Sequence, residues 1–162
     1  MKKENLYITG YELSGENPFK KDLDEASGVE WTFVGLKSNH ARKGALTEIR
    51  RYFLYFYFAI DILLHAKQTK NIITIQQFYG LNIAFFLRLF HLKKTFSLTI
   101  FSFIYKKKKG LLGHVYFKYM KYIVNSKYID KIICHSANEI KYYNDIFTPP
   151  PTQEVSICQI RI

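Results

Sequence analysis

Short apolar runs alternate along the chain with longer segments in which apolar side chains recur every three or four residues. Runs rich in β-branched and aromatic residues are typical of strands, and the longer spacing is typical of helices. The pattern predicts strands over residues 6–11, 29–36, 71–77, 96–103 and 131–135. It predicts helices over residues 46–67, 80–92, 111–128 and 138–147.

Strands and helices therefore follow one another through most of the sequence. Connections of this length favour parallel pairing of the strands, right-handed crossovers, and helices on both faces of the sheet. We expect an α/β fold with a Rossmann-like, mostly parallel sheet. Near the end, Ser136 and Glu139 have the spacing of a capping box directly after a predicted strand. Such a pair starts a helix, so we interpret both residues as structural.

The character of the chain changes after Phe147. Three consecutive prolines, 149–151, end the last predicted helix and cannot donate hydrogen bonds to a sheet. We therefore interpret residues 1–147 as one domain and residues 148–162 as the start of a linker or a non-native tail.

Two apolar stretches, 52–66 and 96–105, are candidates for membrane insertion. Both are shorter than the roughly 20 residues that a membrane-spanning helix needs. Asp61 interrupts the first stretch, and lysines flank the second. We expect both to be core, and the nearly all-round apolar character of 46–67 predicts burial on several sides. Insertion of the first stretch stays open as an alternative.

The composition narrows the choice of partners. The 162 residues carry a formal net charge of +11, which predicts an anionic partner such as nucleic acid, a membrane surface or a phosphorylated substrate. The aromatic fraction of 17% suits a crowded core or a membrane interface. Cys134 and Cys158 predict neither a disulfide framework nor a zinc site, which fits a reducing cytoplasm. Gly10 and Glu12 come too early for a signal peptide, so we expect no export.

Four consecutive lysines stand just before the predicted helix 111–128, where the helix dipole would favour acidic residues. A helical projection places further polar side chains of this helix on one face, in line with the lysines. The predicted basic stripe consists of Lys106, Lys107, Lys108, Lys109, His114, Lys118 and Lys121. Two interpretations stay open: a solvated charge run, or a contact with anionic lipid headgroups or a lipid-linked phosphate. No nucleic-acid-binding motif is present, so nucleic acid is not the expected partner.

A ligand cleft is expected where the strands end. Open α/β sheets bind ligands at the carboxyl ends of their strands, and the loop 10–15 follows the first strand. Its glycines lack nucleotide-binding spacing and can equally make a tight turn. His40 lies in a polar loop after the second strand, and His135 ends a later strand. No Ser-His-Asp arrangement or metal-ligand spacing can be assembled, so catalytic residues stay unassigned and no metal is expected.

The second half of the chain carries a family resemblance. The segments are NIITIQQFYGLNIAFFLRLFHLKKTFSLTIFSF, 71–103, and KKKKGLLGHVYFKYMKYIVNSKYIDKIICHSANEIKYYNDIF, 106–147. They resemble the N-terminal domain of GT-B glycosyltransferases, in particular the retaining family 4 enzymes of bacterial polysaccharide assembly. A Gly-led helix precedes a "vLT"-type strand, here Leu98 and Thr99, and a later strand ends with Ser136 and Glu139. The first 70 residues fit the family only loosely.

The resemblance implies the acceptor-side half of a two-domain enzyme. In the family this domain holds the acceptor, often a sugar on a polyprenyl pyrophosphate at the cytoplasmic face of the membrane. The loop after the first strand lines the cleft. With the two histidines and Ser102, which follows the "vLT" strand, the expected cleft residues are Gly10, Ser14, Gly15, His40, Ser102 and His135. The expected location is cytoplasmic and peripheral, on the inner face of the membrane.

Two departures from the family affect the expected activity. Family members often have His or Asp just after the "vLT" strand, where this chain has Phe101 and Ser102. The C-terminal domain, with its spaced glutamate pair for the nucleotide-sugar donor, has no counterpart here, so we expect no cofactor in this chain and no turnover by it alone. A stand-alone basic module that binds anionic membrane or nucleic acid, and a self-contained nucleotide-binding enzyme, are the alternatives.

Overall fold

The computed structural model describes residues 4–10, 18–35 and 44–157, without the side chains of residues 45 and 48. The strands are β1 (Asn5–Thr9), β2 (Thr32–Gly35), β3 (Asn71–Thr74), β4 (Ser97–Phe101), β5 (Lys131–Cys134) and β6 (Glu154–Ile157). The helices are α1 (Pro18–Ser27), α2 (Ala45–His65), α3 (Gln77–Leu89), α4 (Gly110–Val124) and α5 (Ala137–Ile146), and a short 3₁₀ turn (Ala66–Gln68) follows α2.

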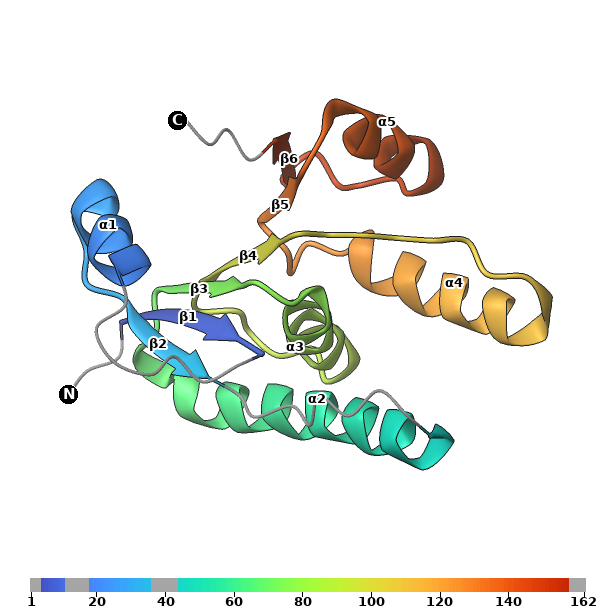
Figure 1. The fold of residues 1–162 in the computed structure, drawn as a ribbon, viewed down its shortest axis with the longest axis horizontal. Helices are drawn as coiled ribbons and strands as arrows, with labels where there is room; N and C mark the ends of the chain where they lie inside the picture. The colour runs from blue at the N-terminus through green and yellow to red at the C-terminus, as the bar shows by residue number, and fades with distance from the viewer. Residues whose placement is uncertain (1–3, 11–17, 36–43, 158–162) are drawn as a thin grey trace.

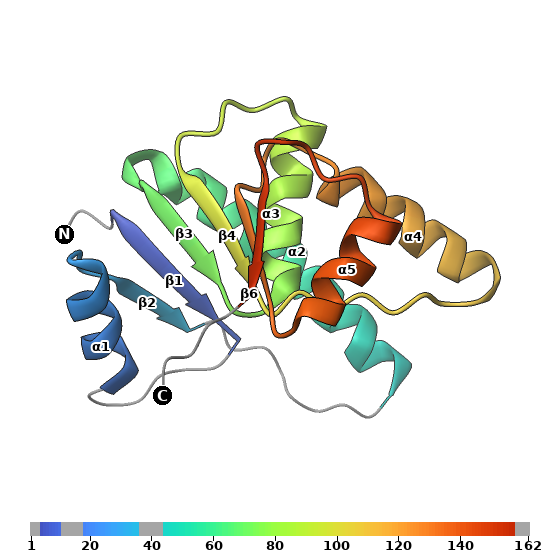
Figure 2. The same cartoon turned by 90° about the horizontal axis from the view of Figure 1, so that it is seen from above.

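The strands form one six-stranded sheet in which every neighbouring pair is parallel (Figure 1). The strand order is β2-β1-β3-β4-β5-β6. The predicted α/β, Rossmann-like class is therefore confirmed. In Figures 1 and 2, α2, α3, α4 and α5 lie on one face of the sheet and α1 lies on the other. The crossover rule explains this, because only the step from β1 to β2 runs in the opposite direction along the sheet.

The core lies between the sheet and the helices of the crowded face. Alternate residues of β3 and β4 point into it, including Ile72, Leu98 and Ile100, which are fully buried. Helix α3 occupies the centre of the helix layer, and most of its side chains are buried. Phe96, Phe103 and Tyr105 are also buried, which confirms the prediction that the stretch 96–105 belongs to the core.

Helix α2 corrects one prediction. Its inner side chains, including Tyr55, Ala59 and Ile62, are buried, but Phe53 and Tyr57 on its outer side are largely exposed. The prediction that residues 46–67 are buried on several sides is wrong. Helix α2 lies at the end of the helix layer and packs against α3 on one side only (Figure 1). None of the described helices combines the length and the apolar character that crossing a membrane requires.

Two elements were not predicted. Helix α1 begins with Pro18, a favourable first residue, and an ion pair of 2.7 Å joins Lys20 to Asp24 one turn later. Strand β6 falls within 148–162, which we interpreted as a linker or non-native tail. Its four residues instead extend the sheet beside β5, with Lys131 Nζ 2.7 Å from Glu154 Oε1. A strand of four residues is too short for its periodicity to separate it from a linker.

Candidate functional site

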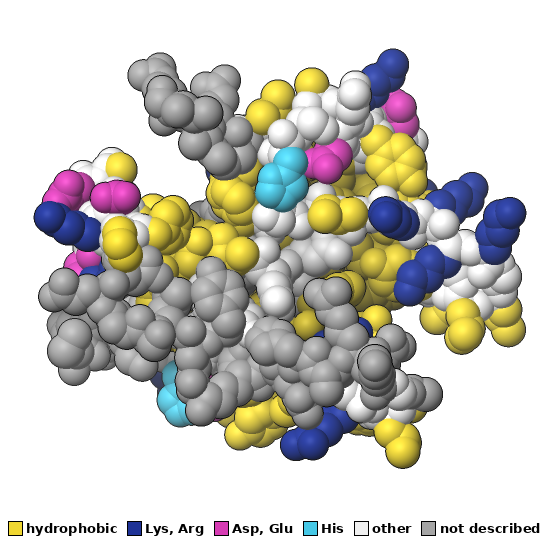
Figure 3. Space-filling model, in the orientation of Figure 1, with side chains coloured by type: hydrophobic (Ala, Val, Ile, Leu, Met, Phe, Trp, Pro, Cys, Tyr) yellow, Lys and Arg dark blue, Asp and Glu magenta, His cyan; other side chains and the backbone are white. Residues whose placement is uncertain are grey.

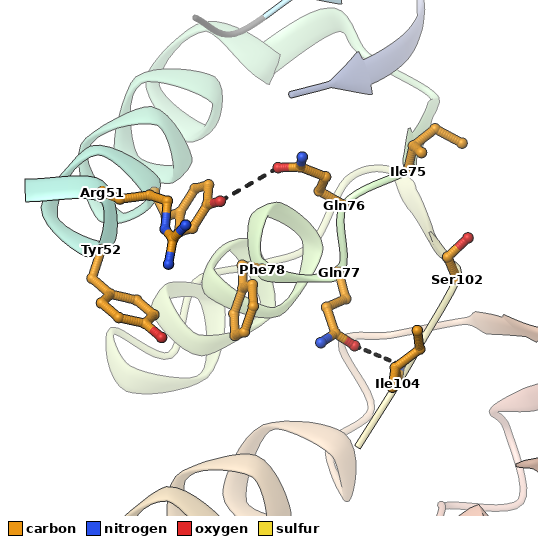
Figure 4. A pocket seen from close by; sticks show the side chains of 9 residues that line it. Arg51, Tyr52, Ile75, Gln76, Gln77, Phe78, Ser102 and Ile104 are labelled. Atoms are coloured by element: carbon orange, nitrogen blue, oxygen red, sulfur yellow. Dashed lines mark hydrogen bonds between the residues drawn. The ribbon is translucent and has the colours of Figure 1, made fainter. Parts of the chain in front are cut away.

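An open pocket of about 730 Å³ lies at the carboxyl ends of β3 and β4. We call it the carboxyl-edge pocket. Its walls come from α2, from the junction of β3 and α3, and from the segment after β4 (Figure 4). The lining residues are Arg51, Tyr52, Tyr55, Ile75, Gln76, Gln77, Phe78, Ser102 and Ile104.

The strand order explains why a pocket forms here. From β1 the chain crosses to β2 on one side, and from β2 it crosses back over β1 to β3 on the other. A crevice opens outside the carboxyl ends of the strands where the direction changes. Gly10 follows β1 at this point, and a Cβ atom there would lie 2.3 Å from Gln76 Nε2. The glycine therefore lets the Gln76 side chain lie across the end of β1.

Two consecutive glutamines form the centre of the pocket. Gln76 Oε1 accepts a long hydrogen bond from the Tyr55 hydroxyl at 3.5 Å, and Gln77 Oε1 accepts the backbone N–H of Ile104 at 2.7 Å. Both bonds use the amide oxygen, so the amide nitrogens are the atoms that can donate to a ligand. In Figure 4 the glutamines lie between Arg51 and Tyr52 on one side and Ser102 and Ile104 on the other.

Ser102 has an unusual backbone conformation for a residue with a side chain. Its φ of 62° lies in the left-handed region, although its backbone N–H donates to the Ile133 carbonyl at 3.0 Å. Non-glycine residues in this region concentrate at ligand sites and switch regions, where the surrounding structure holds them. The geometry puts Ser102 at the pocket wall directly after β4.

Aromatic rings form the apolar side of the pocket. Tyr55 and Phe78 stack with ring centroids 5.7 Å apart, and Tyr52 meets Phe78 edge to face at 6.1 Å. Burial raises the pKa of Tyr55, with the positive charge of Arg51 opposing it in part. The Tyr55 hydroxyl therefore stays protonated at neutral pH and can donate.

The chemistry that these groups offer is recognition of a polar ligand with an anionic part. Arg51 supplies a permanent positive charge suited to phosphate or carboxylate, and the glutamine amides and Ser102 supply neutral hydrogen bonds. No His, Asp or Glu is among the described residues that line the pocket. Within the described ranges, no group of three or more His, Cys, Asp or Glu residues could hold a metal ion.

The predicted cleft residues have different outcomes. Ser102 lines the pocket, and Gly10 lies against its wall. His135 is exposed at the end of β5, where its ring faces Phe101 with centroids 6.4 Å apart, and it does not line the pocket. The other three predicted cleft residues, Ser14, Gly15 and His40, lie outside the described residues.

Sequence reasoning missed Arg51, Tyr52, Tyr55 and the glutamines. One signal was available, because two polar residues directly follow an apolar strand at Gln76 and Gln77. Their strand was predicted to run through residue 77, whereas β3 ends at Thr74. The polar pair therefore belongs to the carboxyl edge. Arg51 carried no such signal, since its place depends on how α2 packs.

The basic stripe lies outside the pocket. All seven of its side chains are exposed, and none of them lines the pocket. In Figure 3, dark blue side chains gather around α4. The lysine run folds back onto the helix, because Gly113 leaves room for the Lys108 carbonyl where a Cβ atom would lie 2.2 Å away. Lys108 Nζ lies 4.8 Å from the centroid of the Tyr116 ring.

The predicted helix cap at Ser136 is confirmed, although the Glu139 side chain reaches back to the residue before the N-cap and not to the N-cap itself. Ser136 Oγ accepts the backbone N–H of Glu139 at 3.3 Å, and Glu139 Oε2 accepts the backbone N–H of His135 at 2.7 Å. Cys134, just before, is buried, and burial together with the Glu139 charge raises the pKa of its thiol to about 11. This thiol is therefore unsuited to act as a nucleophile at neutral pH.

Comparisons with protein-family models, with curated proteins and with solved structures found no match for this chain.

Proposed function

We propose that this chain is the acceptor-binding half of a GT-B glycosyltransferase, which moves a sugar from a nucleotide donor to a lipid-linked saccharide in surface polysaccharide synthesis. The donor, a nucleotide sugar, would bind to a second domain. The domain would work at the inner face of the cytoplasmic membrane, with its basic stripe against anionic lipid. The family resemblance of 71–147 supports this assignment.

The carboxyl-edge pocket is the observation that carries the proposal. Its arginine can pair with a phosphate, its two amides can donate to sugar hydroxyls, and its aromatic rings offer apolar walls. Its described lining has no His, Asp, Glu, Lys or Cys, the side chains that most often act as general acid or base beside tyrosine, and the Tyr55 hydroxyl is bonded to Gln76. The role of this chain is therefore to bind and orient the acceptor, and we expect no turnover without the donor-binding domain.

A second candidate is a stand-alone basic α/β module that binds anionic membrane without catalysis. The observation in its favour is that all seven residues of the basic stripe are exposed and lie away from the pocket. Under this alternative the pocket has no saccharide ligand. The two candidates therefore differ in whether the pocket binds a sugar phosphate.

The test is a calorimetric titration of the chain with a hexose 1-phosphate. We expect saturable binding that Arg51→Gln weakens about tenfold, because a charge-assisted contact to phosphate is lost. Arg50→Gln is the matched control, since Arg50 is exposed and does not line the pocket. Absence of saturable binding, or equal losses in the two variants, would overturn the proposal. Vesicle binding without sugar phosphate binding would favour the stand-alone module.

A further inference from the structure

Large apolar side chains are exposed along the N-terminal halves of α2 and α4. Leu111 is 81% exposed and Leu112 is 84% exposed, although both lie in the first turn of a helix with an otherwise well-packed inner side. On α2, Leu46 is 83% exposed and Phe53 is 72% exposed. We call these residues, with the exposed Ile49 and Val115, the apolar apex. A cluster of this kind marks a surface for a partner or a membrane.

The two halves of the apex lie at the same edge of the molecule. The N-terminal ends of α2 and α4 both extend to the right of the sheet in Figures 1 and 2. Between the helices is a largely apolar groove of about 300 Å³. Its lining comes from α2, α3 and α4 and consists of Tyr52, Phe56, Phe78, Asn82, Leu112, Val115, Tyr116 and Tyr119. The groove therefore continues the apolar surface of the apex between the helices.

On the α4 half of the apex, the charges have a single sign. Lys106–Lys109 are exposed and end one residue before Leu111, and Arg50 is exposed next to Ile49. In the sequence, no Asp or Glu occurs between Asp61 and Asp130. Figure 3 shows yellow side chains projecting beside the dark blue ones at the end of α4. An apolar tip with cations beside it is complementary to an anionic leaflet, whose headgroups are negative and whose interior is apolar.

We propose that the apolar apex inserts into an anionic lipid leaflet, with the lysines at the level of the headgroups. The contact would thus combine insertion of apolar side chains with the attraction between the lysines and the anionic headgroups. A second copy of the chain is a poorer occupant, because it carries the same net charge of +11. The inference rests on the membrane part of the proposed function and is independent of sugar transfer.

Insertion would fix how the domain faces the membrane. Tyr52 and Phe78 line both the apolar groove and the carboxyl-edge pocket. The pocket would therefore lie close to the headgroups, where a phosphate on a lipid could reach Arg51.

The first experiment is co-sedimentation with phosphatidylcholine vesicles that contain phosphatidylglycerol. We expect Leu111→Ser with Leu112→Ser to lower vesicle affinity at least tenfold while all lysines remain. The matched control is Leu89→Ser with Leu92→Ser, which removes two exposed leucines at and just after the C-terminal end of α3, away from the apex. The control variant is expected to bind as the wild type does. Thermal unfolding confirms that both variants fold.

The second experiment reports on insertion itself. In Leu112→Trp, the new indole is expected to shift its emission to the blue on vesicles and to be quenched by brominated acyl chains. Trp31 is 6% exposed in the wild type, so wild-type emission provides the baseline. Insertion would be overturned if Leu112→Trp bound to vesicles but its emission were not quenched by the brominated chains. It would also be overturned if the apex variant and the control variant lost the same vesicle affinity. Dimerisation that only the apex variant abolishes would also overturn it, in favour of a second copy. Hexose phosphate binding is measured separately, so a failure of one proposal is distinguishable from a failure of the other.

Discussion

Gln77 and Ile104 are joined by a hydrogen bond of 2.7 Å, in which the side-chain amide oxygen accepts the backbone N–H. The bond connects the first residue of α3 to the segment that leads from β4 to the lysine run. Both residues line the carboxyl-edge pocket, so the bond fixes the distance between two of its walls. The same bond also holds the start of the segment that leads to Lys106–Lys109, the first part of the basic stripe.

Replacing Gln77 tests that connection. Gln77→Leu removes the acceptor of the Ile104 N–H, and we expect a loss of about 1 kcal/mol in the free energy of unfolding. The Ile104 amide should exchange its hydrogen at least several-fold faster, as measured by NMR. Gln68→Leu is the control, because Gln68 is exposed in the 3₁₀ turn after α2. Unchanged exchange at Ile104 would contradict the role assigned to this bond.

Gly10→Ala tests the close approach between β1 and the pocket. The added Cβ would overlap the Gln76 amide, whose atoms lie 2.3 to 2.5 Å away, so the flexible glutamine side chain should move. We expect a change in unfolding free energy below about 1 kcal/mol, together with weaker hexose phosphate binding. In a Gln76→Ala background the same substitution should have no further effect on binding. An effect of equal size in both backgrounds would show that Gly10 acts independently of Gln76.

Ser136→Ala tests the helix cap. The substitution removes the oxygen that accepts the Glu139 N–H, and the expected loss is about 1 kcal/mol of unfolding free energy. Urea denaturation followed by circular dichroism measures it. Ser97→Ala, at the exposed start of β4, should leave the urea midpoint nearly unchanged. A hexose phosphate affinity lowered by Ser136→Ala in the folded protein would speak against a purely structural role.

Asp24 predicts a pH dependence of stability. Its carboxylate accepts from Lys20 Nζ at 2.7 Å and from the Trp31 backbone N–H at 2.8 Å. The hydrogen bond from Lys20 is the main reason why the pKa of Asp24 lies below its ordinary 3.8, and the Trp31 bond lowers it further. Burial opposes the shift. A depressed pKa stabilises the fold above the unfolded value of 3.8, and the effect disappears as the pH falls through the folded value.

The measurement is urea denaturation of the wild type and Asp24→Asn across acidic and neutral pH. The variant should be less stable at neutral pH, and the difference should shrink once the wild-type carboxyl is protonated. Asp22→Asn, which changes an exposed neighbour on α1, is the charge-matched control. A difference between wild type and Asp24→Asn that stays constant down to the lowest pH would contradict the linkage.

Local sequence signals determined most of the secondary structure. The isoleucine-rich run at β3 and the apolar alternation at β4 predicted two central strands, and their alternation with helices predicted the parallel sheet. Ser136 and Glu139 predicted a helix start because a capping box involves only neighbouring backbone groups. Such features depend on residues a few positions apart, so a single sequence contains the information they need.

Only the tertiary structure decided which surfaces are free and which residues meet. Arg51, Gln76 and Ser102 are far apart in the chain, and the sheet order brings them to one pocket. Phe53 and Leu112 are as apolar as core residues, yet both are exposed, because each helix packs on one side only. Apolar periodicity indicates which side chains can be buried. Whether they are buried depends on whether another element covers them. The sequence by itself therefore determined the strands, helices and basic run, and packing decided the pocket and the apolar apex.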